Sequence, residues 1–186
     1  MKVSFLTGAR RDCRDDGTPC DRLPSWDGND PWVLQDPEEI KIAQGFEGTV
    51  DDWVLRISLE RTLSFGFAGA RIELSRGVFV ADIQKVDGGV GLVNAVVAGS
   101  SPAESLLHFV NRAEFTTGSK ICNSNFRPVA EGVVCSLRDL RSDMTNGPCD
   151  ALSLAFGFSA VPVTLSDASP PPFEEGCEGI EASVCP

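Results

Sequence analysis

A period-2 alternation of apolar and polar residues begins at residue 53 and constrains this chain to β structure. The apolar positions are Trp53, Leu55, Ile57 and Leu59, and Arg56, Ser58 and Glu60 alternate with them. Successive side chains of a strand point to opposite faces of a sheet, so this spacing predicts a strand with one buried and one solvated face. The apolar phase continues to Phe67 and then changes across Gly69, which predicts a β-bulge or a turn between two strands.

Four later runs also have strand character. β-Branched residues dominate 78–86 and 90–97, and Asp87-Gly88-Gly89 between them is a hairpin signal. Residues 152–158 alternate apolar with small or polar side chains. The run 161–165 contains Pro162, which has no N–H to donate to a ladder. We therefore expect this last strand at a sheet edge or at a bulge.

The segment after residue 100 has two interpretations. Ser101, Pro102 and Glu104 form the start signal of a helix that would run to Asn111. The apolar residues of 105–116 also fit a strand. We favour the strand, because the runs on both sides are β, and the helix is the alternative.

The spacing of these runs predicts an all-β fold. Turns about every ten residues are typical of an antiparallel jelly-roll-type β-sandwich, here of about nine strands with long disulfide-braced loops. We expect a single domain over residues 1–186, with an acidic loop-rich segment 8–50, a sandwich core 51–166 and a Pro-rich, cystine-bearing tail 167–186. The short apolar strand from Lys2 to Leu6 is expected to pair within its own chain, and exchange with a neighbouring subunit is the alternative.

Seven cysteines occur singly along the chain. They are Cys13, Cys20, Cys122, Cys135, Cys149, Cys177 and Cys185. No two have the C-x-x-C spacing of a redox or zinc motif, so we interpret them as half-cystines of a protein from an oxidising compartment, extracellular or at the cell surface. One arrangement pairs Cys13 with Cys20, Cys122 with Cys135 and Cys177 with Cys185, and leaves Cys149 free. The other ties the N-terminal loop to the C-terminal tail, through Cys13 or Cys20 and Cys177 or Cys185.

The overall charge argues against two classes of partner. The 186 residues carry a net charge of -11, with a pI near 4.5. Nucleic acids and anionic membranes are bound mainly through Lys and Arg, so we expect neither as a partner. Residues 1–7 lack the apolar core of a signal peptide. No stretch approaches the ~20 apolar residues that a membrane-spanning helix needs, so membrane insertion is not expected either.

Most of the net negative charge lies between Asp12 and Asp52, a segment that contains nine Asp and three Glu but only three basic residues. Carboxylates on loops are ligands for Ca²⁺, which is the candidate cofactor. The candidate metal ligands are Asp12, Asp15, Asp16, Asp27 and Asp30. The alternative is a solvated acidic segment, since DG and ND pairs are also turn formers. Trp26 and Trp32 are the candidate glycan-stacking residues, and the alternative is that they anchor a long loop on the core.

His108 is the single histidine and lies between Leu107 and Phe109. A Ser-His-Asp or Cys-His centre would have to use it, whereas its place in an apolar run favours a structurally satisfied imidazole. A metal site with several histidines cannot form within one chain. Gly88-Gly89-Val90-Gly91 lacks the spacing and the Lys of a phosphate-binding loop, which argues against nucleotide binding.

The strand rhythm between Trp53 and Leu165 is carried by the segments 67–74, 78–97, 106–115 and 152–158. In this rhythm the chain resembles the cohesin-like and carbohydrate-binding-module-like β-sandwiches of large bacterial extracellular proteins. The resemblance covers about three-fifths of the chain. It implies a jelly-roll-type sandwich used for attachment or scaffolding rather than for catalysis.

We therefore predict a non-enzymatic extracellular module for adhesion, surface structure or assembly, with a protein partner or a second copy of itself. Calcium-assisted glycan binding through Trp26 and Trp32 is one alternative. A hydrolase with a carboxylate pair is the other, because 27 acidic residues make some close pair nearly inevitable in space.

Overall fold

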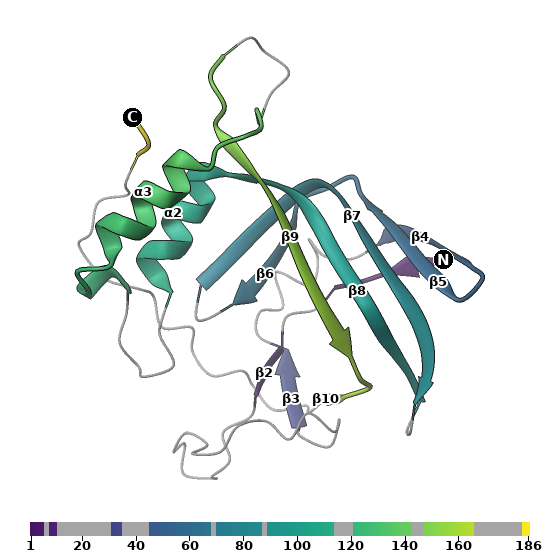
Figure 1. Cartoon of the computed structure of the whole chain (residues 1–186). Helices are drawn as coiled ribbons and strands as arrows, with labels where there is room; N and C mark the ends of the chain where they lie inside the picture. Colours follow the sequence, from purple (N-terminus) through teal and green to yellow (C-terminus); the bar gives the residue numbers. More distant parts are fainter. Residues whose placement is uncertain are drawn as a thin grey trace, which may run out of the picture. The chain divides into compact units, whose positions relative to one another are not determined.

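The computed structural model describes residues 1–5, 8–10, 31–34, 45–67, 70–86, 89–113, 121–142, 147–165 and 184–186. The strands are β1 (Lys2–Val3), β2 (Gly8–Arg10), β3 (Pro31–Leu34), β4 (Phe46–Asp51), β5 (Val54–Leu59), β6 (Leu63–Phe67), β7 (Ala70–Val86), β8 (Gly89–Pro102), β9 (Ala151–Ala160) and β10 (Thr164–Leu165). The helices are α2 (Ala103–Arg112), the short η1 (Ile121–Asn123) and α3 (Arg127–Ser136) (Figure 1). A mostly antiparallel β structure confirms the all-β expectation.

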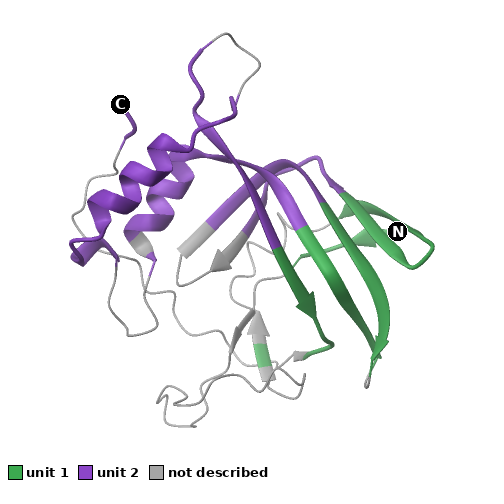
Figure 2. Cartoon of the chain, in the orientation of Figure 1, with its two compact units in different colours: residues 1–57, 79–96, 157–172 green, residues 58–78, 97–156, 173–186 purple. Residues whose placement is uncertain are grey.

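The strands form a seven-stranded and a three-stranded sheet. The first has the order β1-β4-β5-β7-β8-β9, with β6 paired to β7, and the second has the order β10-β3-β2. By contacts the chain divides into two compact units, coloured in Figure 2. Unit 1 comprises Met1–Ile57, Phe79–Val96 and Gly157–Pro172, and unit 2 comprises Ser58–Val78, Val97–Phe156 and Phe173–Pro186. Strands β5, β7, β8 and β9 each contribute residues to both units.

Unit 1 contains a cluster of aromatic side chains, of which Phe46 and Phe79 are buried. Phe5 makes edge contacts with Phe46 and Phe79, at ring-centre distances of 5.6 and 5.4 Å. Phe79 also contacts Phe158, at 6.0 Å. Such pairs add to the free energy gained from burial alone. The N-terminal strand β1 pairs antiparallel with β4 of the same chain, as predicted, although it ends at Val3.

In unit 2, helices α2 and α3 pack together. A hydrophobic cluster joins both helices to strand β9. Ala103, Leu106 and Leu152 are its buried members, and Val134, Leu154 and Cys185 pack against them. The strand favoured for 105–116 is wrong, because residues 103–112 form α2. The buried residues Leu106, Leu107 and Val110 recur with helical spacing, which turns one face of α2 to the core. Pro102, not Ser101, is the N-cap residue.

The phase change after Phe67 is a turn between strands. Strands β6 and β7 pair antiparallel, with Phe67 opposite Ala70 as their last pair. The two connecting residues, 68 and 69, lie outside the described part. The neighbouring runs 78–86 and 90–97 lie in the adjacent strands β7 and β8, as predicted, although the residues of the connecting turn, 87 and 88, are not described.

Two strand predictions are partly wrong. In β5 the side chains of Leu55, Ile57 and Leu59 are buried as expected, but Trp53 is 70% exposed because it lies in the turn before β5. The last run is shorter than expected: Val161 and Val163 are exposed and only Thr164–Leu165 forms β10. Strand β10 does lie at the edge of its sheet. Pro162 precedes the strand, so its missing N–H removes no ladder bond.

Candidate binding site

Only one residue of the predicted calcium and glycan sites is described. Trp32 is half-buried in β3, with Arg10 and Leu165 as its backbone neighbours on either side. The remaining candidates, Asp12, Asp15, Asp16, Asp27, Asp30 and Trp26, lie outside the described residues. Within the described ranges no group of three or more His, Cys, Asp or Glu side chains could hold a metal ion. No helix of this part of the chain has the length and apolar character needed to span a bilayer.

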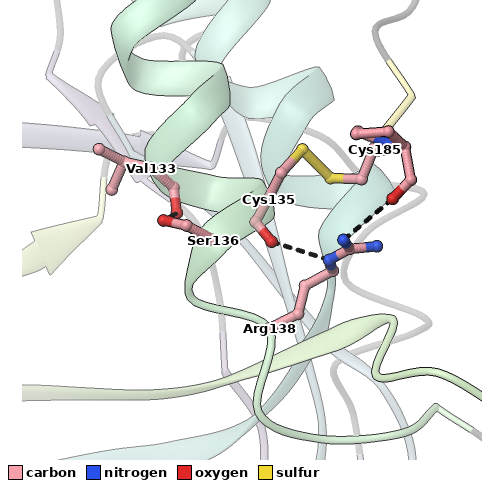
Figure 3. The surroundings of a disulfide bond; sticks show 6 residues. Val133, Cys135, Ser136, Arg138 and Cys185 are labelled. Atoms are coloured by element: carbon pink, nitrogen blue, oxygen red, sulfur yellow. Dashed lines mark hydrogen bonds between the residues drawn. A yellow bond between two sulfur atoms is a disulfide. The ribbon is translucent and has the colours of Figure 1, made fainter.

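The cysteines show why sequence proximity misleads. Cys135 of α3 is bonded to Cys185, 50 residues later, so the pairings of Cys122 with Cys135 and of Cys177 with Cys185 are wrong (Figure 3). Cys122 is disulfide-bonded as well, and Cys149 has a free, half-buried thiol as expected. The residues Cys13, Cys20 and Cys177 lie outside the described part. A bond between a helix and a distant tail depends on tertiary structure, which spacing does not report.

His108 is exposed on α2, which does not fit the expectation of a structurally satisfied imidazole within an apolar run. Its neighbour Leu107 is 2% exposed. A helix turns about 100° per residue, so adjacent positions face different directions. In a helix, neighbouring residues of an apolar run can therefore lie on the buried and on the exposed face.

An open hollow of about 880 Å³ lies over unit 2, lined by Arg76, Gly77 and Val78 of β7, Ala98, Gly99 and Ser100 of β8, Ser153, Leu154 and Ala155 of β9, and Leu140 and Arg141. Arg76 has a left-handed backbone, with φ of 49°, at which β7 departs from regular geometry. Its guanidinium donates to the carbonyl of Arg141 at 2.7 Å. The pKa of Asp150 is lowered mainly by hydrogen bonds from Ser142, and the Arg76 charge adds a smaller contribution in the same direction. Because the Arg76 charge serves these contacts, we do not assign the hollow an anionic ligand.

Two reciprocal Asp–Ser pairs hold the segment before β9 against the start of that strand. Asp139 accepts hydrogen bonds from both the N–H (2.8 Å) and the hydroxyl of Ser153. Asp150 accepts the equivalent two bonds from Ser142, with the N–H at 2.5 Å. Between them Leu140 and Ala151 form an antiparallel bridge. Hydrogen bonds from each serine lower the pKa of its aspartate, because they stabilise the charged carboxylate.

These shifts give a prediction for acid stability. A folded-state pKa below the unfolded value of 3.8 stabilises the fold fully above that value, and the stabilisation is lost as the pH falls through the lower folded pKa. We expect the double variant Asp139→Asn/Asp150→Asn to unfold with a weaker pH dependence below about pH 4 than the wild type. Urea unfolding at a series of pH values measures this, with Glu60→Gln as the control. An unchanged pH dependence in the double variant would contradict the role of the two pairs.

Among the described residues of unit 2, four exposed apolar side chains follow one another along α3 and its two cap positions. These residues, with their exposed fractions, are Phe126 (52%), Val129 (56%), Val133 (49%) and Leu137 (59%). The spacings of three, four and four residues place them on one helix face. No residue of α3 is buried. We call this set the α3 stripe; it spans roughly 16 Å at 1.5 Å per residue.

The opposite side of α3 is firmly attached. Val134 packs on the Ala103, Leu106 and Leu152 cluster. The Cys135–Cys185 disulfide joins the helix to the tail, and Arg138 donates to the carbonyl of Cys135 at 2.8 Å, as Figure 3 shows. Arg138 also donates to the carbonyl of Pro186 at 3.1 Å. The α3 stripe is therefore presented on a braced helix rather than on a loose one.

The sequence reasoning missed α3, although two signals were present. Pro128 lies in the first helical turn, a position that Pro favours, and the four apolar residues of the α3 stripe have helical spacing. Gly132 and three valines within ten residues lower the intrinsic helix propensity.

No protein-family model, curated protein or solved structure matches this chain.

Proposed function

We propose that this protein is a non-enzymatic extracellular assembly module that associates with a second copy of itself through the α3 stripe. The observation that carries the proposal is the row of four half-exposed apolar side chains on a disulfide-braced helix. Large exposed apolar patches on soluble proteins mark interaction sites more often than isolated apolar residues do.

The Cys135–Cys185 bond supports the extracellular part of the proposal. Cytosolic reductants keep thiols reduced, whereas extracellular compartments preserve such bonds. A second cystine at Cys122 adds to this argument. Adhesion and surface structure are the roles that such a module would serve.

The order of side chains in the α3 stripe favours a second copy as the partner. In an antiparallel pairing about a two-fold axis, Val129 lies opposite the partner's Val133, and Phe126 lies opposite the partner's Leu137. Small residues then meet at the centre and large ones at both ends, so one surface is complementary to itself, as a two-fold interface requires. Helices packed in this way lie about 8–10 Å apart.

The net charge of the protein also favours the α3 stripe as the contact between two copies. Two copies that each carry a net charge of -11 repel each other, so contact is favoured where the surface is uncharged. The α3 stripe contains no ionisable side chain, and the adjacent Arg127 and Glu131 form an ion pair at 2.7 Å within the helix. The stripe is small compared with the ~800 Å² per partner of a standard interface, so we expect weak association, with a Kd on the order of 10 µM.

The proposal predicts that Val133→Asp makes the protein monomeric. A carboxylate at the centre of the contact would lose its water without gaining a partner, so the dimer should weaken at least tenfold. Light scattering coupled to size-exclusion chromatography, at concentrations around the wild-type Kd, measures the effect. Val133 is half-exposed, so the monomer should keep its fold.

Val90→Asp is the matched control, since Val90 is 60% exposed on β8 and the substitution adds the same charge. This variant should associate like the wild type. A wild type that is monomeric at every concentration, or a Val133→Asp variant that still dimerises, would refute the proposed role of the stripe.

We also propose that the chain folds as a jelly-roll-type sandwich of about nine strands. A jelly-roll-type sandwich of about nine strands is typical of attachment modules. The antiparallel seven-stranded sheet supports it. An experimental structure with a single open layer would contradict it.

A further inference from the structure

The hairpin between β4 and β5 has an unusual turn. Asp51 pairs with Val54, so Asp52 and Trp53 are the two central residues (Figure 1 labels both strands). Both have left-handed backbones, with φ of 47° and 63°. This is the geometry of a type I′ turn, which fits the twist of a hairpin and which Asn-Gly or Asp-Gly adopts most readily.

Trp53 is a poor residue for this position. A positive φ is unfavourable for a bulky side chain, so Trp here is an outlier where Gly would be unstrained. The surrounding backbone enforces the conformation: Asp51 and Val54 pair, and the N–H of Ile83 in β7 donates to the carbonyl of Trp53 at 2.7 Å. Strain that neighbours maintain in this way is a recognised mark of functional positions.

Packing of the indole does not offset the energetic cost of this backbone conformation. Trp53 is 70% exposed, and its ring contacts no other aromatic ring of the described residues. A single exposed apolar residue is ordinary. An exposed Trp in a strained turn is unusual, because both the positive φ and the exposure of the indole to water are unfavourable.

The outer face of the same hairpin carries hydrogen-bonding groups. Phe46, Leu55 and Ile57 point to the core, so the alternate residues Glu47, Thr49, Asp51 and Arg56 point outward. Thr49 lies directly opposite Arg56 in the ladder. The structure describes no hydrogen bond or ion pair for these four side chains. We call these four residues the polar strip; it runs along the hairpin toward the turn that holds the exposed Trp53.

We propose that this strip, with Trp53 at its tip, binds a neutral polysaccharide chain. The C–H face of a sugar ring packs on an exposed indole, and sugar hydroxyls both donate to carboxylates and accept from Arg and Thr. The three carboxylates of Glu47, Asp51 and Asp52 outnumber the nearby cations, Arg56 and the Lys2 opposite Glu47 in the ladder, which disfavours an anionic glycan or membrane. Arg56 and Thr49 supply donors beside these carboxylates, and this mixture of donors and acceptors suits sugar hydroxyls, each of which can donate and accept. A Lys-rich peptide would use the carboxylates alone through its charge, and the test below distinguishes it by its salt dependence.

The test is titration calorimetry of the full chain with neutral hexasaccharides of glucose, mannose, xylose and N-acetylglucosamine. We expect binding to at least one of them, little changed by 0.5 M NaCl, and a blue shift of Trp fluorescence on binding. Trp53→Gly should weaken it at least tenfold. The same substitution should leave the thermal midpoint unchanged or raise it by about 2–4 °C, because it removes the strained conformation.

Phe126→Ala is the matched control, since Phe126 is an exposed aromatic of the α3 stripe outside the hairpin. It should lose self-association and keep sugar binding, so failure of either proposal can be told from failure of the other. A flat response to all four hexasaccharides, or equal binding by Trp53→Gly, would overturn the inference. Binding of a Lys-rich peptide alone, abolished by 0.5 M NaCl, would overturn it in favour of a cation site.

Discussion

Replacing Cys135 and Cys185 together by serine is expected to lower the free energy of unfolding by about 4 kcal/mol. The bond joins residues 50 apart, and a cross-link over that separation removes much conformational freedom from the unfolded chain. The substitution also removes packing from the native state, because Cys185 packs against the cluster of Ala103, Leu106 and Leu152. Urea unfolding, followed by circular dichroism, gives the free energy.

Cys149→Ser is the control for this experiment, since the Cys149 thiol is free and only half-buried. Its unfolding should resemble that of the wild type. A loss of less than about 1 kcal/mol in the double variant would mean that the bond contributes little to the fold. The α3 stripe would then not depend on the oxidised state for its presentation.

Gly77→Ala is expected to lower the free energy of unfolding by about 3 kcal/mol, because among the glycines compared Gly77 has the closest obstacle to a Cβ. A Cβ at Gly77 would lie 2.0 Å from the carbonyl oxygen of Ala98 and 2.9 Å from the Cα of Gly99. Both obstacles are backbone atoms of the adjacent strand β8, so no side chain can turn away to make room. The strands would have to separate, which breaks ladder hydrogen bonds.

Gly132→Ala is the matched substitution with the opposite sign. A Cβ there has no atom within 4 Å, and the residue lies inside α3. Alanine should stabilise the helix by up to about 1 kcal/mol. Thermal unfolding of the two variants beside the wild type measures both effects. A tolerated Gly77→Ala would contradict the close approach of β7 and β8.

The strand pattern was predictable because burial on one face of a sheet imposes a strict period of two. Leu55, Ile57 and Leu59 are buried for this reason, and 152–156 shows the expected alternation of burial. Trp53 has the same parity and yet lies in a turn. Parity reports which face a residue would occupy in a strand but not where the strand begins.

The helices were harder to predict, because short apolar runs fit both periods. Leu106, Leu107 and Val110 form one helix face in the structure, whereas the favoured strand depended on the neighbouring β runs. For the Cys135–Cys185 pair, the two residues are far apart in the chain and meet only once α3 has packed. The α3 stripe and the strained turn at Trp53 likewise become visible only when exposure and backbone angles are known.

Sedimentation equilibrium of the oxidised chain at about 50 and 500 mM NaCl tests the central claim most directly, because these salts span a strong change in charge screening. We expect a monomer–dimer equilibrium that tightens at the higher salt, since the contact is apolar and the two copies repel each other. Val133→Asp should remain monomeric in both solutions. A wild type that is monomeric throughout, or a dimer that dissociates as salt is added, would contradict assembly through the α3 stripe.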